Sequence, residues 1–180
     1  ARWNLTDDPN SLREADVIIV TVPTPVTAAR VPDLKPLINA TADISTYAKE
    51  GVTVVYESTV YPGVTESICV PIIAKNKIFK HRENFWVAYS PERINPGDKI
   101  HTLCTTTKIV SGDTEDTLNL VDSIYSKITK TFRAKSIKVA EAAKVIENTQ
   151  RDVEIGLVNE LANIFGRLGI DTNDVIDAAS

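Results

Sequence analysis

Apolar residues recur at steps of three and four along residues 136–168, which is the period of an α-helix. Ser136 fits the N-cap of this helix, and Gly169 fits the left-handed residue that commonly ends one. At about 1.5 Å per residue the helix is roughly 50 Å long, more than the width of a small domain. We therefore expect it either to join two domains or to pack against a second copy of itself.

Short apolar runs rich in β-branched residues alternate with amphipathic stretches in the part of the chain before this helix. Such runs predict buried strands, and the stretches between them predict helices. The order of these elements predicts an α/β fold with a mostly parallel sheet. The expected strands are 16–22, 52–57, 85–89, 108–111 and 129–134. The expected helices are 36–50, 64–74, which we expect to be interrupted near Pro71, and 114–127.

Three loops of unusual composition directly follow predicted strands. They comprise residues 22–25, 57–63 and 90–97, and they are rich in proline, hydroxyl and charged side chains. In open α/β sheets, ligands bind beyond the carboxyl ends of the strands. The clustering of the loops therefore indicates a binding site. On the long helix, Lys144 and Asn148 are four residues apart and so share a face.

Each of these groups also has a purely structural interpretation. The hydroxyls of the 57–63 loop fit an N-capping turn for the next helix. Glu92 and Arg93 fit a surface ion pair, whereas the Lys144–Asn148 pair and Glu141 fit a solvated helix face with a salt-bridge partner. Taken one at a time, these interpretations are favoured over catalytic ones.

Composition narrows the class of protein. The net charge of −4 comes without a basic run, which predicts no nucleic-acid partner. Apolar stretches such as Val17–Val20 are too short to span a bilayer, so we predict no membrane segment. Cys69 and Cys104 do not form a disulfide framework, which favours the cytoplasm. Neither histidine has partners at metal-ligand spacing, and we predict no metal site.

The chain also has features expected of a piece of a longer protein. It contains no methionine, and a new helical pattern begins at Asp171. No G-x-G-x-x-G motif occurs, although a dinucleotide-binding sheet usually carries one after its first strand. If the chain is a fragment, we expect that strand to precede Ala1.

Taken together, the motifs resemble those of the nucleotide-sugar dehydrogenases, the UDP-glucose/GDP-mannose dehydrogenase family. The resemblance covers essentially the whole chain. It implies an enzyme that uses NAD to oxidise the C6 alcohol of a nucleotide sugar twice, giving the uronic acid. The matching stretches are Val22-Pro23-Thr24-Pro25, Ser58-Thr59-Val60 with Pro62-Gly63, Pro91-Glu92, Glu141-Ala142-Ala143-Lys144 with Asn148, and Asn159-Glu160.

The same resemblance implies the domain organisation. Residues 1–134 correspond to the C-terminal half of a Rossmann-like, NAD-binding sheet. Residues 135–180 correspond to the long linking helix and the start of an all-α dimerisation domain. Apolar residues lie on more than one side of Val153–Leu168, and we predict a homodimer packed across this segment. The family's nucleophilic cysteine lies in a glycine-rich motif that neither Cys69 nor Cys104 matches.

Site residues follow from the resemblance by position. Lys144 and Asn148 are expected to stabilise the oxyanion of tetrahedral intermediates, because both are hydrogen-bond donors. Glu92 is expected to act as general base or to position the hydrolytic water, with Thr59 as its hydroxyl partner. The expected cofactor-binding residues are Pro23, Thr24, Ser58, Thr59 and Glu92, and the expected substrate-binding residues are Arg93, Asn95, Lys144, Asn148 and Arg151.

The third loop indicates the branch of the family. Glucose-type members read Pro-Glu-Phe-x-x-Glu-Gly, whereas Pro96 replaces the second glutamate here. This loop, together with Glu147–Asp152, resembles the branch that acts on UDP-N-acetylhexosamines, as do the Vi-antigen and O-antigen dehydrogenases. UDP-glucose, UDP-N-acetylmannosamine and GDP-mannose remain alternative substrates. A non-catalytic dimerisation module and a 6-phosphogluconate-type dehydrogenase are alternatives of other kinds, although Ala140 replaces a glycine of the latter's motif.

Overall fold

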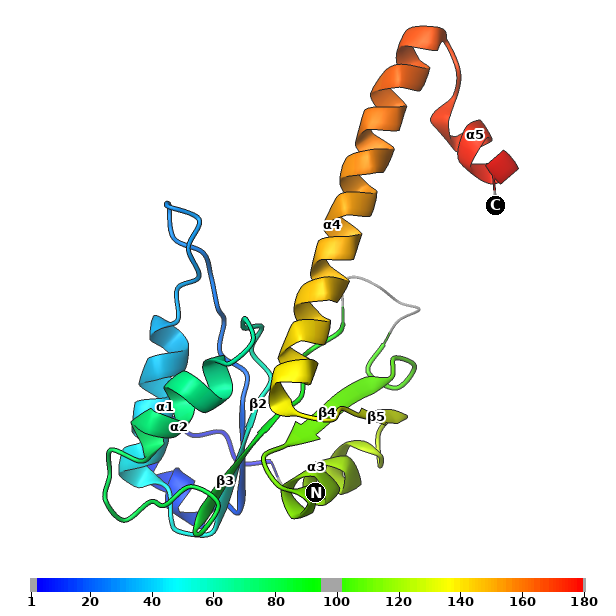
Figure 1. Ribbon diagram of the computed structural model, residues 1–180. Coiled ribbons are helices and arrows are strands. Elements are labelled where there is room, and N and C mark those ends of the chain that lie inside the picture. The colour runs from blue at the N-terminus through cyan, green and yellow to red at the C-terminus, as the bar shows by residue number, and fades with distance from the viewer. Residues whose placement is uncertain (1–2, 95–101, 180) are drawn as a thin grey trace. The chain divides into compact units, whose positions relative to one another are not determined.

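The computed structural model describes residues 3–94 and 102–179 of the chain (Figure 1). The chain divides into two compact units, one up to Lys144 and the other from Val145 onward. The long helix α4 (Ile137–Leu168) contributes to both units. The predicted boundary at residue 134 remains a prediction.

The first unit is built on a five-stranded sheet with the strand order β1-β2-β3-β4-β5. Its strands are β1 (Val17–Val20), β2 (Val52–Tyr56), β3 (Phe85–Tyr89), β4 (Lys108–Gly112) and β5 (Thr131–Arg133). All neighbours are parallel except β3 and β4, which pair antiparallel with Tyr89 opposite Ser111. The α/β fold and the mostly parallel sheet predicted from the sequence are therefore confirmed.

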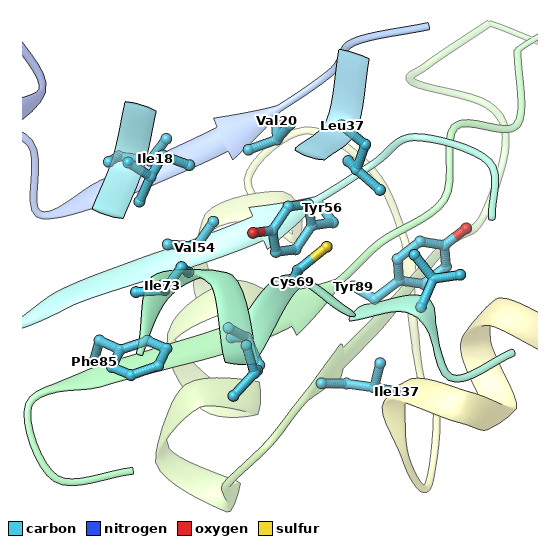
Figure 2. Packing of buried hydrophobic residues seen from close by; sticks show 14 of the residues in the cluster. Ile18, Val20, Leu37, Val54, Tyr56, Cys69, Ile73, Phe85, Tyr89 and Ile137 are labelled. Atoms are coloured by element: carbon cyan, nitrogen blue, oxygen red, sulfur yellow. The ribbon is translucent and has the colours of Figure 1, made fainter. Parts of the chain in front are cut away.

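Helices cover both faces of this sheet. On one face, buried side chains of α1 (Lys35–Tyr47), α2 (Val70–Ile73) and the first turns of α4 belong to the same core cluster as Val54 and Tyr56 of β2 (Figure 2). On the other face, α3 (Glu115–Tyr125) packs against Val55 of the same strand. Both faces of β2 are thus buried, which explains why four of its five residues are apolar and why apolar and polar positions do not alternate along it.

The segment predicted as an interrupted helix over 64–74 consists of two short helices. The turn before α2 is a π-helix, η2 (Thr65–Cys69). Elsewhere, a 3-10 helix, η1 (Pro9–Glu14), precedes β1. The N–H of Val70 bonds to the carbonyl of Thr65, five residues back. Pro71 follows at once, and because it has no N–H to donate, a regular helical ladder cannot continue through it. The prediction of an interruption near Pro71 is confirmed.

The caps predicted for the long helix are also confirmed. The Ser136 hydroxyl accepts the N–H of Val139 at 3.2 Å, and Gly169 adopts a φ of +69° directly after the helix. A short helix, α5 (Thr172–Ala179), follows. In this second unit, apolar side chains such as Val153, Leu157 and Leu168 are exposed. Among the described residues, no helix is long and apolar enough to span a membrane.

Candidate functional site

A pocket of about 280 Å³ lies beyond the carboxyl ends of β1, β2 and β3. The loops after these three strands form its walls, as the sequence predicted. Among its lining residues are all five of the expected cofactor-binding residues. The lining consists of Thr21, Val22, Pro23, Thr24, Glu57, Ser58, Thr59 and Glu92.

Two side-chain hydroxyls join the first two loops. Ser58 donates to the carbonyl of Val22 at 2.6 Å, and Thr24 donates to the carbonyl of Thr59 at 2.7 Å. The N-capping interpretation of the second loop is wrong, because η2 begins after Val64, whose side chain cannot cap a helix. These hydroxyls instead fix the shape of the pocket wall, and the Thr59 side chain remains exposed beside them.

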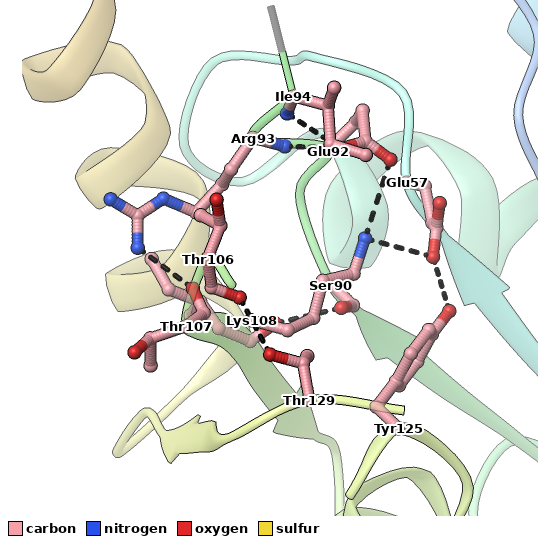
Figure 3. Close-up of polar contacts among 11 residues, drawn as sticks. Glu57, Ser90, Glu92, Arg93, Ile94, Thr106, Thr107, Lys108, Tyr125 and Thr129 are labelled. Carbon is pink, nitrogen blue, oxygen red and sulfur yellow. Dashed lines mark hydrogen bonds and ion pairs between the residues drawn. The ribbon is translucent and has the colours of Figure 1, made fainter. Parts of the chain in front are cut away.

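Glu92 presents a partly exposed carboxylate to this pocket. Its Oε1 accepts the backbone N–H groups of Arg93 at 2.6 Å and Ile94 at 2.7 Å. Its Oε2 lies 3.8 Å from the ammonium of Lys108, and 45% of the side chain is exposed (Figure 3). One oxygen is therefore committed to the loop backbone, whereas the other can act on a ligand.

A buried polar cluster behind Glu92 was not predicted from the sequence. Lys108 is only 2% exposed, and its ammonium lies 3.1 Å from Oε1 of Glu57. The Tyr125 hydroxyl donates to the same oxygen. Burial, followed by the bond to Glu57, raises the pKa of the Tyr125 phenol far above its usual range, so it stays a donor. A lysine at the start of an apolar strand signals a buried charge at that position, but its partners depend on the direction of the strand.

The substrate-binding candidates of the third loop are only partly described. Arg93 donates from Nη1 to the carbonyl of Thr107 at 2.9 Å, which ties the loop to the residue before β4. Asn95 lies outside the described residues, as does Pro96.

The start of α4 contradicts the solvated-face interpretation for two of its residues. Glu141 is fully buried, and its carboxylate accepts the N–H groups of Gly63 at 2.5 Å and Thr65 at 3.0 Å. It is therefore not a surface salt-bridge partner but a tie between α4 and the turn after the second pocket loop. Lys144, one turn further along, is also buried. Sequence reasoning missed the role of Glu141, since its partners are backbone groups.

Two further candidates on α4 belong to the second unit. Asn148 is half-buried, and Arg151 lies 3.4 Å from Glu147, four residues earlier on the helix. Their positions are described within that unit alone, so their expected roles toward the pocket stay predictions. Within the described residues, no group of three or more metal-ligating side chains is present.

Comparison with known proteins finds relatives that are similar to nearly the whole chain. Two UDP-N-acetyl-D-glucosamine 6-dehydrogenases are each 53% identical to the chain: one from Salmonella typhi, covering 97% of the chain and 41% of that protein, and one from Pseudomonas aeruginosa, covering 98% and 42%. The structure of a UDP-D-ManNAc dehydrogenase from Pyrococcus horikoshii superposes with a TM-score of 0.88 at 31% identity, covering 97% of the chain and 41% of that protein. The chain thus spans about two fifths of the length of these relatives.

Two family models match consecutive parts of the chain. Residues 2–129 match the NAD binding domain of the UDP-glucose/GDP-mannose dehydrogenase family, and residues 138–180 match its central domain. The first match alone covers more than half of the chain and contains all the residues that line the pocket. The chain therefore belongs to the UDP-glucose/GDP-mannose dehydrogenase family.

Proposed function

We propose that the whole protein is an NAD-dependent UDP-N-acetylglucosamine 6-dehydrogenase of surface polysaccharide biosynthesis. It oxidises the C6 alcohol of the sugar twice, through an aldehyde, to the uronic acid. The observation that carries the proposal is the 53% identity to two relatives of that name across nearly the whole chain. The pocket at the strand ends supports it, because this is where an α/β sheet binds a dinucleotide.

The residues of the pocket fit the nicotinamide half of NAD. Proline and hydroxyl-bearing loops form the wall, and Glu92 adds a partly exposed carboxylate beside it, which suits a cationic nicotinamide ring. Bound NAD would supply the hydride acceptor for both oxidations. Thr24 and Ser58 hold the two loops together by the bonds described above, so their contribution is to keep the wall in shape.

The chemical groups on this chain supply proton transfer and charge stabilisation. The exposed oxygen of Glu92 accepts a proton from the sugar alcohol or the hydrolytic water, with the hydroxyl of Thr59 as its partner. The ammonium of Lys144 and the amide of Asn148 donate to the developing oxyanion. One such donor typically lowers a barrier by about 3 kcal/mol.

Two further charged side chains would bind the nucleotide sugar. Arg93 and Arg151 carry guanidinium groups, which suit the pyrophosphate of the substrate. Asn95 is proposed as a further substrate-binding residue of the third loop.

UDP-N-acetylmannosamine is the second candidate substrate. A UDP-N-acetyl-D-mannosamine dehydrogenase from Methanococcus aeolicus is 36% identical over 93% of the chain, which is less than the identity to the glucosamine enzymes. The test is NADH absorbance when the full-length protein is incubated with NAD and each of four substrates: UDP-N-acetylglucosamine, UDP-N-acetylmannosamine, UDP-glucose and GDP-mannose. Highest kcat/KM with UDP-N-acetylglucosamine is expected. No NADH with any of them would favour a non-catalytic dimerisation module.

We further propose that the protein is a cytoplasmic homodimer assembled through the second half of α4. The exposed apolar side chains of Val153, Leu157 and Leu168 support this assembly, since burying them against a second copy removes them from water. Sedimentation of the full-length protein tests it. Leu157→Lys is expected to shift the protein toward monomer, whereas Glu160→Gln on the same helix is expected to leave the dimer intact.

A further inference from the structure

We propose that Lys108 is a positioning residue that fixes the carboxylate of Glu92 in the pocket. The inference rests on the proposed function, in which Glu92 is the general base. Lys108 does not line the pocket and is almost completely buried. Any effect it has on the reaction must therefore pass through another residue.

The burial of Lys108 demands partners, because a lysine is almost never fully buried unless it is paired. Its ammonium has two carboxylates within reach, Glu57 at 3.1 Å and Glu92 at 3.8 Å, and it also lies 5.2 Å from the centre of the Tyr125 ring. Figure 3 shows the ammonium between the two carboxylates, which reach it from different loops. Lys108 is thus a cationic bridge between the second and third loops of the pocket.

Glu57 anchors this bridge on one side. The Tyr125 hydroxyl donates to the oxygen that also faces Lys108, so two partners hold it. The Glu57 side chain is only 12% exposed, whereas that of Glu92 is 45% exposed. Glu57 is therefore the more rigidly held of the two carboxylates. It fixes the position of the Lys108 ammonium, which in turn fixes the carboxylate of Glu92.

Glu92 has a choice of orientation that Lys108 removes. Its Oε1 is held by the N–H groups of Arg93 and Ile94, which are part of its own loop and move with it. Its Oε2 lies 3.8 Å from the ammonium of Lys108, which belongs to strand β4 of the sheet. Arg93 ties the same loop to Thr107. The hydrogen bond from Arg93 to the Thr107 carbonyl fixes the position of the loop, whereas Lys108 orients the Glu92 carboxylate relative to the sheet.

The experiment compares Lys108→Met with Glu92→Gln and with the double variant in the full-length protein. Displacing a catalytic group by about 1 Å can cost roughly 100-fold in rate. We expect Lys108→Met to lower kcat at least about tenfold with little change in the KM for the nucleotide sugar. Because Lys108 acts through Glu92, the double variant is expected to be no slower than Glu92→Gln alone. Lys127→Met, at an exposed lysine after α3, is the matched control and is expected to keep wild-type kcat.

A charge-balanced variant distinguishes a loss of activity caused by unfolding of the protein from one caused by misplacement of the Glu92 carboxylate. If Lys108→Met does not fold, Lys108→Met/Glu57→Gln removes the ammonium without leaving Glu57 charged and unpaired. The same loss of kcat is expected from it. A folded Lys108 variant with wild-type kcat would overturn the positioning role. So would a double variant with Glu92→Gln in which the two losses of kcat multiply. Neither result would affect the proposed function. Absence of turnover by the wild-type protein would overturn the proposed function, and the inference with it.

Discussion

Glu141 on α4 accepts the backbone N–H of Thr65 at 3.0 Å, from a position 76 residues further along the chain. The N–H groups at the start of a helix have no partner within it, and a carboxylate is well suited to them. Glu141 therefore caps η2 from another element. It joins the turn after the second pocket loop to the helix that carries Lys144.

Substituting this cap tests its contribution to stability. Glu141→Gln keeps the size of the side chain but replaces one acceptor oxygen with an amide that faces an N–H group. We expect the free energy of unfolding to fall by about 2 kcal/mol, the range for losing a charge-assisted hydrogen bond in a buried site. Urea unfolding measures it. Glu160→Gln, exposed on the same helix, is the control, and equal midpoints for the two variants would contradict the capping role.

The two cysteines are predicted to differ sharply in reactivity. Burial raises the pKa of the Cys69 thiol to about 11, and the side chain lies in the core beside Tyr56 (Figure 2), whereas Cys104 is exposed. Because the thiolate is the reactive form, Cys104 should react with a disulfide reagent at least about 100-fold faster in the native protein. Absorbance of the released thiolate follows the reaction. Cys104→Ser should lack the fast phase, and a fast phase persisting in that variant would contradict the burial of Cys69.

Asp122 is predicted to make stability depend on acid pH. The hydroxyl of Thr131, and then the guanidinium of Arg133, hold the pKa of this carboxyl below its ordinary value of 3.8. A folded-state pKa below the unfolded one stabilises the fold above the unfolded value, and this stabilisation is lost as the pH falls through the folded value.

The size of the effect is modest because the group lies near the surface. Relative to Asp122→Asn, we expect the wild-type chain to gain less than about 1 kcal/mol near pH 6. The difference should shrink between about pH 4 and pH 2. Urea midpoints of both proteins across this range provide the measurement. A difference that grows as the pH falls would show the sign to be wrong.

Residues 1–180 expressed alone are predicted neither to bind NAD tightly nor to turn over nucleotide sugar. The sequence contains no G-x-G-x-x-G motif and no glycine-rich cysteine motif, so a phosphate-binding loop and the nucleophile implied by the family are both missing. Absorbance at the NADH band, with UDP-N-acetylglucosamine and NAD, is the assay, and the full-length protein is the positive control. NADH production by the 180-residue chain would contradict the prediction.

Much of the fold could be predicted because hydrophobic period and turn residues are local signals. The run Val52–Tyr56 indicated a strand buried on both faces, and Ser136 and Gly169 marked the ends of the long helix correctly. The three loops were correctly expected to meet, because the carboxyl ends of parallel strands share an edge of the sheet. In these cases the type of residue at each position was enough to indicate the local structure.

The cluster around Lys108 could not be predicted in this way. The period of a strand does not encode its direction, and β4 runs antiparallel to β3. This reversal brings the first residue of β4 to the edge where β2 and β3 end, so Lys108 meets Glu57 there. Glu141 escaped prediction for a different reason, since backbone N–H groups give no side-chain signal in the sequence.

The reversed strand also determines when the bridge can form during folding. Lys108 reaches Glu57 once β4 has docked beside β3, a pairing that must close the long connection between the two strands. If docking of β4 follows the rate-limiting step, the ion pair is absent from the transition state. Charge-balanced removal of the pair would then accelerate unfolding while leaving the folding rate nearly unchanged. The ion pair would then contribute to kinetic stability: it would slow unfolding of the assembled pocket without accelerating its folding.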